Sequence, residues 1–103
     1  MKLGVVVTDE AFARQAVGLI DAATTRGWET RCFLTDSGVR LLQDPSFERV
    51  CLSRRSEIAL CEMSAERFHM EAPSRRLEEH GVVVGGQYQN AELVAHCDQV
   101  IVL

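Results

Sequence analysis

The hydrophobic positions of this chain fall into two alternating patterns. Short continuous apolar runs of strand length are separated by segments in which apolar residues return every three or four positions, as on one face of a helix. The runs predict strands over residues 3–7, 28–34, 58–60, 82–84 and 99–103. The periodic segments predict helices over residues 12–23, 39–42, 47–51, 64–70, 74–77 and 91–97.

Capping and breaking residues mark the ends of several of these elements. Asp44 and Pro45 interrupt the second helical segment. Ser46 is a residue type that caps helix N-termini, so it is predicted to begin the next helix. A strand over residues 50–52 is an alternative to that helix. Pro73 is predicted to end the fourth helical segment.

Strands that alternate with helices indicate a parallel sheet with helices on both faces. The 103 residues suffice for one hydrophobic core and not for two. The sequence therefore predicts a single α/β domain over residues 1–103, with three layers and about five mostly parallel strands. Ligands of such sheets bind beyond the carboxyl ends of the strands. The residues predicted to meet at that edge are Thr8, Asp36, Ser37, Cys61, Ser64, Gly85 and Gly86.

Cys61 is the residue at this edge with the clearest chemistry. A predicted strand precedes it, and Ser64 and Glu66 are typical of a helix start, so the thiol is expected beside the first turn of a helix. The positive end of a helix favours a thiolate, which is the nucleophilic form of cysteine. Acidic and arginine side chains both flank the site, so the local charge is mixed.

Most free cysteines are small buried core residues, and this is the alternative interpretation of Cys61. Core packing is the better interpretation of Cys32, on an alternating strand, and of Cys51, on an apolar helix face. It is also the better one for Cys97, near a helix end, although Cys97 is kept as a candidate for a second thiol.

The neighbours of Cys61 have structural as well as chemical explanations. Ser64 stands three residues after the cysteine, where dithiol redox proteins carry their resolving cysteine. A serine there prevents intramolecular disulfide exchange and still permits a persulfide or a mixed disulfide, and it is equally suited to be a helix cap. Gly85 and Gly86 allow backbone N–H groups to approach an anion or a persulfide, and they also suit a tight turn.

Two other kinds of site are weaker alternatives. Cys61 and Arg67 have the Cys-x5-Arg spacing by which tyrosine-phosphatase-type loops hold a phosphate above a thiolate. This loop lacks glycine and carries Glu62 and Glu66, whose charges repel a phosphate dianion. The three histidines show no metal-ligand spacing with one another or with the cysteines, so the sequence predicts no metal and no other cofactor.

Composition narrows the expected partners and location. A net charge of −4 without a basic stripe argues against nucleic acid or an anionic membrane as the main partner. The pairs Arg54-Arg55 and Arg75-Arg76 either attract anionic sulfur species or acidic partners, or form a solvated face. The amino terminus resembles neither a signal peptide nor a membrane span, and four cysteines without a Cys-x-x-Cys pair are typical of thiols, so a cytoplasmic protein is expected.

Five stretches carry a resemblance to a known family. They are Lys-Leu-Gly-Val-Val-Val-Thr (2–8), Arg-Cys-Phe-Leu-Thr-Asp-Ser-Gly-Val (31–39), Ala-Leu-Cys-Glu-Met-Ser-Ala (59–65), Val-Val-Gly-Gly (83–86) with the helix at Ala91, and Asp-Gln-Val-Ile-Val-Leu (98–103). In this order they resemble the DsrE/DsrF-like family, which includes sulfur-relay subunits of bacteria and archaea. The resemblance covers nearly the whole chain.

The resemblance implies a small α/β subunit that forms homo-oligomers, often trimers or hexamers, or hetero-oligomers with related subunits. In catalytic members it implies sulfane sulfur carried as a persulfide on the cysteine that matches Cys61. Members with a second cysteine three residues later are matched here by Ser64, which argues against a dithiol mechanism. Other subunits of the family lack a working cysteine and serve as scaffolds.

Two hypotheses follow for the function. In the first, Cys61 of a cytoplasmic sulfur carrier or sulfurtransferase takes sulfane sulfur from a donor protein or a small sulfur species and passes it to an acceptor thiol. In the second, the protein is a non-catalytic oligomeric partner or a small-ligand-binding module, and Cys61 is merely packed. The accessibility of the thiol in the folded protein separates them.

Overall fold

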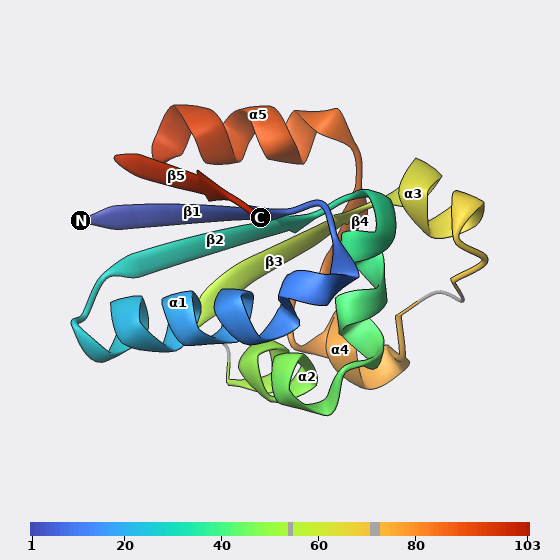
Figure 1. Ribbon diagram of the computed structural model, residues 1–103, viewed down its shortest axis with the longest axis horizontal. Coiled ribbons are helices and arrows are strands. Elements are labelled where there is room, and N and C mark those ends of the chain that lie inside the picture. The colour runs from blue at the N-terminus through green and yellow to red at the C-terminus, as the bar shows by residue number, and fades with distance from the viewer. Residues whose placement is uncertain (54, 71–72) are drawn as a thin grey trace.

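The computed structural model describes residues 1–53, 55–70 and 73–103, which form a five-stranded sheet with helices on both faces (Figure 1). The strand order is β4-β3-β2-β1-β5, and every pairing is parallel. The strands are β1 (Lys2–Val7), β2 (Glu29–Leu34), β3 (Ser56–Cys61), β4 (Val83–Gly85) and β5 (Gln99–Val102). The predicted α/β fold is confirmed.

The helices cover the two faces of the sheet unequally (Figure 1). On one face lie α1 (Ala13–Thr25), α2 (Pro45–Leu52) and α4 (Arg75–Glu79), and on the other lies α5 (Gln87–His96). Helix α3 (Glu62–Arg67) continues directly from the carboxyl end of β3. Two 3-10 segments, η1 (Glu10–Phe12) and η2 (Asp36–Gln43), follow β1 and β2. No helix in the described ranges has the length and apolar character needed to cross a membrane.

Two hydrophobic cores lie on opposite faces of the sheet, because alternate side chains of a strand point to opposite sides. The larger core packs against α1 and α2 and includes Cys32 of β2 and Cys51 of α2. The smaller one packs under α5 and consists of Val6, Phe33, Cys61 and Leu93. Cys32 and Cys61 therefore lie on neighbouring strands but on different faces.

The segment after β2 differs from its prediction in three ways. Helical structure begins at Asp36, as the 3-10 segment η2, instead of at residue 39. Helix α2 is capped by Asp44 and not by Ser46, since the Asp44 carboxylate accepts the backbone N–H of Ser46 at 2.9 Å and that of Phe47 at 3.3 Å. The alternative strand over residues 50–52 is wrong, because α2 continues to Leu52.

Two later helices begin earlier than their sequences predict. Helix α3 begins at Glu62, immediately after Cys61, so the prediction that Ser64 caps it is wrong. Helix α5 begins at Gln87, where the side chain of Gln89 accepts the N–H of Gly86 at 2.7 Å and so stabilises the first turn.

Candidate functional site

The carboxyl ends of three neighbouring strands bring the site together. In the parallel sheet, Leu34 of β2 pairs with Leu60 of β3, and Cys61 pairs with Gly85 of β4. Thr35 follows β2 directly, so it stands beside Cys61 at the same edge. The predicted convergence of turns around the cysteine is thus present for β2, β3 and β4.

One buried and one half-buried hydroxyl group lie next to the thiol. Cys61 is 6% exposed, and Ser64, in the first turn of α3, is 2% exposed. The Oγ of Ser64 accepts the backbone N–H of Asp36 at 2.9 Å and lies 3.3 Å from the Oγ1 of Thr35. A polar cluster of Thr35, Asp36 and Ser64 therefore adjoins the sulfur, although the side chain of Cys61 also contacts the apolar core under α5.

Hydrogen bonds to the thiolate control the acidity of Cys61. Burial by itself raises the pKa of this thiol, but the hydroxyl and N–H of Ser64, the N–H of Met63 and the hydroxyl of Thr35 outweigh burial and hold the pKa below its ordinary value. The two N–H groups belong to the first turn of α3, where a helix provides them with no internal partner. Cys61 thus has the donors that a thiolate needs.

The other three thiols have the opposite tendency. Burial raises the pKa of Cys32, with a further contribution from neighbouring Cys51, and burial raises the pKa of Cys51 to about 12. Burial also raises the pKa of Cys97, which packs against the same apolar cluster as Cys61. Cys97 lies beside Gly4, toward the amino ends of the strands, so it is not at the edge that holds Cys61, and its thiol favours the protonated form.

Two of the predicted site residues have other partners. The hydroxyl of Thr8 donates to the carbonyl of Leu103 at 2.8 Å and fastens the end of the chain to β1. The Oγ of Ser37 accepts the N–H of Glu10 at 3.1 Å and joins η2 to η1. Thr8 and Ser37 therefore have structural roles that do not involve Cys61.

Gly85 and Gly86 lie beside Cys61 as predicted, but both glycines contact the side chain of Gln89. A Cβ atom on Gly85 would collide with the side-chain amide of Gln89. The N–H of Gly86 is already bonded to the Oε1 of the same residue. Gly85 therefore makes room for a helix-capping side chain, and the N–H of Gly86 is bonded to that side chain instead of being free for an anion.

A comparison with protein-family models identifies the chain. The model of the DsrE/DsrF-like family matches residues 1–103, the whole sequence. The chain belongs to the DsrE/DsrF-like family. No curated protein matches the sequence. Membership indicates a role in sulfur relay at the level of the family.

Sequence reasoning missed two groups at the site of this DsrE/DsrF-like protein. Thr35 directly precedes Asp36 and Ser37, which the sequence predicts as site residues, and has similar chemistry. Only the adjacency of β2 and β3 shows that Thr35 lies beside Cys61. The N–H of Met63 was missed because the start of α3 was predicted two residues too late. The useful signal for both is position relative to a strand end.

The alternative chemistries find little support in this family member. Residues 62–67 form a helix instead of a phosphate-binding loop, and the Nη1 of Arg67 contacts the Oδ1 of Asp36 at 3.0 Å. Arg75 pairs with Glu79 at 3.0 Å on an exposed surface, whereas Arg54 lies outside the described residues. Among the residues that the structure describes, no group of histidine, cysteine and acidic side chains is arranged to hold a metal ion.

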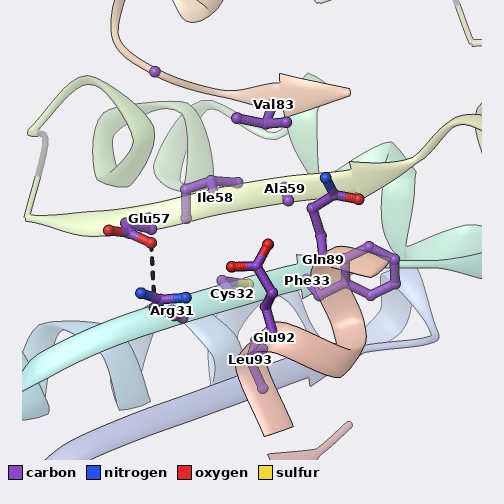
Figure 2. Close-up of a pocket in the computed structure, with 11 residues that line it drawn as sticks. Arg31, Cys32, Phe33, Glu57, Ile58, Ala59, Val83, Gln89, Glu92 and Leu93 are labelled. Carbon is purple, nitrogen blue, oxygen red and sulfur yellow. Dashed lines mark ion pairs between the residues drawn. The ribbon is translucent and has the colours of Figure 1, made fainter. Parts of the chain in front are cut away.

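A separate pocket of about 390 Å³ opens on the α5 face of the sheet (Figure 2). Its charged wall contains Arg31, whose Nε lies 3.2 Å from the Oε2 of Glu57, and Glu92 of α5. Phe33 and Ala59 from its floor also pack in or against the core that contains Cys61. The remaining lining residues are Cys32, Ile58, Gly81, Val83, Gln89 and Leu93.

Proposed function

We propose that this protein carries sulfane sulfur as a persulfide on Cys61. The observation that supports the proposal most directly is the set of hydrogen-bond donors around this sulfur, which lowers the pKa of Cys61 while the other three cysteines have raised pKa values. Membership of a family that contains sulfur-relay proteins agrees with this chemistry. The protein is proposed to act in the cytoplasm with donor and acceptor proteins or small sulfur species.

The transfer proceeds as two displacements at sulfur. In the first, the Cys61 thiolate attacks the sulfane sulfur of a donor persulfide, a new S–S bond forms at Cys61, and the donor leaves as a thiolate. In the second, an acceptor thiolate attacks the outer sulfur of the Cys61 persulfide, and Cys61 leaves as a thiolate. One S–S bond forms and one breaks in each step, so no external oxidant or reductant is needed.

The site residues have defined roles in these displacements. Thr35 and Ser64 stabilise Cys61 as attacking thiolate in the first step and as leaving thiolate in the second, since the same hydroxyls serve both. Ser64 occupies the position of a resolving cysteine, and a hydroxyl does not displace sulfur from a persulfide. The outer sulfur is therefore retained for an external acceptor.

Mass spectrometry of the reduced protein after incubation with inorganic polysulfide tests the proposal. We expect a mass increase of one sulfur on the peptide that contains Cys61, and loss of this adduct in Cys61→Ser. Cys97→Ser serves as the matched control and keeps the adduct. An adduct that persists in Cys61→Ser, or that is spread over Cys32, Cys51 and Cys97, contradicts the carrier function.

A non-catalytic ligand-binding module is the second candidate, and the pocket beside α5 is the observation that favours it. Cys61 is only 6% exposed, which also suits a packed residue. This candidate predicts that Cys61 of the folded protein resists both polysulfide and iodoacetamide, while denatured protein reacts at all four cysteines. Reaction of Cys61 under native conditions at neutral pH contradicts it.

A further inference from the structure

Asp36 has an unusual backbone conformation beside Cys61. Its φ angle is 48°, in the left-handed region that residues other than glycine rarely adopt, although aspartate and asparagine tolerate it better than most. This conformation directs the Asp36 N–H to the Oγ of Ser64 at 2.9 Å. The left-handed conformation of Asp36 therefore accompanies a specific hydrogen bond from its N–H to Ser64.

The side chain of Asp36 is held from the other end of α3. Its Oδ1 lies 3.0 Å from the Nη1 of Arg67, the last residue of that helix. Asp36 thus contacts α3 twice, through its N–H at Ser64 and through its carboxylate at Arg67. We call these two contacts the Asp36 clamp.

The Asp36 clamp limits how the hydroxyl hydrogens of Ser64 and Thr35 can be shared. The Asp36 N–H occupies one lone pair of the Ser64 oxygen, and the 3.3 Å contact between Thr35 and Ser64 uses one of the two hydroxyl hydrogens. In either direction of that contact, one hydroxyl hydrogen is left for another acceptor. Cys61 lies directly before α3 and beside the end of β2, so its sulfur is the nearby acceptor, and donation from both hydroxyls lowers its pKa.

We propose that Asp36 and Arg67 are positioning residues whose ion pair holds the Ser64 oxygen as an acceptor and so keeps one hydroxyl hydrogen of the Ser64–Thr35 pair directed at the Cys61 sulfur. The inference rests on the proposed function for its biological role, because it concerns the same thiolate. Its physical content is that a surface ion pair, through the backbone of Asp36, controls the reactivity of a buried cysteine. Neither residue contacts the reacting sulfur in this scheme.

The test measures the rate at which iodoacetamide alkylates Cys61 as a function of pH, with the site of reaction identified by peptide mass spectrometry. Arg67→Ala removes the ion pair, and Asp36→Asn removes the charge while it keeps the backbone N–H and a tolerance for the left-handed conformation. Arg49→Ala is the matched control, because Arg49 forms an Arg–Asp pair at 2.9 Å with similar exposure, 60% against 63% for Arg67, on α2.

In both Arg67→Ala and Asp36→Asn we expect the pH profile to move to higher pH, with the alkylation rate at pH 7 lowered about twofold to threefold, the range of an exposed ion pair. The plateau rate at high pH should rise by no more than about twofold, because a thiolate that has lost a donor is more basic and slightly more nucleophilic. The double variant should be no slower than either single variant, since both break one pair. Arg49→Ala should match the wild type.

An unchanged profile in Arg67→Ala overturns the proposal, as do additive effects in the double variant. A plateau raised well beyond about twofold also overturns it, because that result means that the substitution opens the site instead of reorienting a donor. If Cys61 does not react with iodoacetamide, the ultraviolet absorbance of its thiolate, taken as a difference from Cys61→Ser in a Cys97→Ser background, gives the same profile. A shifted profile without a polysulfide adduct refutes the carrier and leaves the clamp intact.

Discussion

Cys32 and Cys61 lie on adjacent strands with similarly small exposed fractions, but Cys32 lies deeper below the surface, and the pKa values of the two thiols move in opposite directions. Cys32 is 2% exposed and Cys61 is 6% exposed. Burial raises the pKa of Cys32, whereas hydrogen-bond donors overcome burial and lower the pKa of Cys61. The exposed fraction of a thiol is therefore a poor guide to its reactivity in this fold.

Position along the strand explains the difference. Cys32 lies in the middle of β2, where the backbone N–H groups of neighbouring residues are committed to parallel strands on both sides. Cys61 is the last residue of β3, so the N–H groups that follow belong to the first turn of a helix and have no partner within it. The carboxyl end of a parallel strand supplies donors that its middle lacks.

The largest expected effect is an alkaline loss of stability caused by the buried thiols. Above about pH 8.5 an unfolded cysteine ionises, whereas Cys32 and Cys51 stay protonated in the folded protein. The unfolded state then binds fewer protons than the folded state, so the free energy of unfolding falls as pH rises. The loss is about 1.4 kcal/mol per pH unit for each thiol, or about 2 kcal/mol each at pH 10.

Urea unfolding of Cys51→Ala and wild type across this pH range measures that loss. Cys51→Ala should lose stability about half as steeply between pH 8.5 and 10. Cys61→Ala should keep the wild-type slope there. In the wild type, the lowered pKa of folded Cys61 adds stability that is fully present above about pH 8.5, the pKa of an unfolded cysteine. This contribution is lost as the pH falls toward the pKa of folded Cys61. Cys61→Ala should lack this rise in stability with pH. Equal alkaline slopes in Cys51→Ala and wild type contradict the comparison.

Serine substitutions at the two positions should both lower the free energy of unfolding, but by unequal amounts. In Cys32→Ser the new hydroxyl is buried among apolar side chains, so we expect the free energy of unfolding to fall by about 1–3 kcal/mol. In Cys61→Ser the hydroxyl meets Thr35 and Ser64, so the loss should stay below about 1 kcal/mol. Urea unfolding at neutral pH, with Cys32→Ala as the volume control, distinguishes them, and equal losses would show that the two environments do not differ.

The sequence alone predicts the sheet and the place of Cys61 at its edge, because apolar periodicity is a local property. The continuous runs before Thr8 and Cys61 are too short for buried helices and therefore indicate buried strands. The caps were less predictable. Ser46 and Ser64 are both suitable cap residues. However, Asp44 caps α2, and α3 begins directly after β3.

The contents of the site depend on which strands are neighbours, and local patterns do not contain that information. Thr35, Asp36 and Ser37 form one turn of similar chemistry. The order β4-β3-β2 places Thr35 and the N–H of Asp36 against α3, while Ser37 points to η1. Tertiary adjacency, and not residue type, decides which of the three acts on the cysteine.

The smallest effect in this series comes from the hydroxyl of Thr35, the last of the groups that stabilise the Cys61 thiolate. Thr35→Val keeps the shape of the side chain and removes the hydroxyl, so the rate of Cys61 alkylation at pH 7 should fall about twofold to fivefold, equivalent to about 0.5–1 kcal/mol. Thr35→Ser keeps the donor and should react like the wild type. If Thr35→Val also reacts like the wild type, Ser64 and the first turn of α3 account for the lowered pKa without help from β2, and the contrast between Cys32 and Cys61 reduces to the end of one strand.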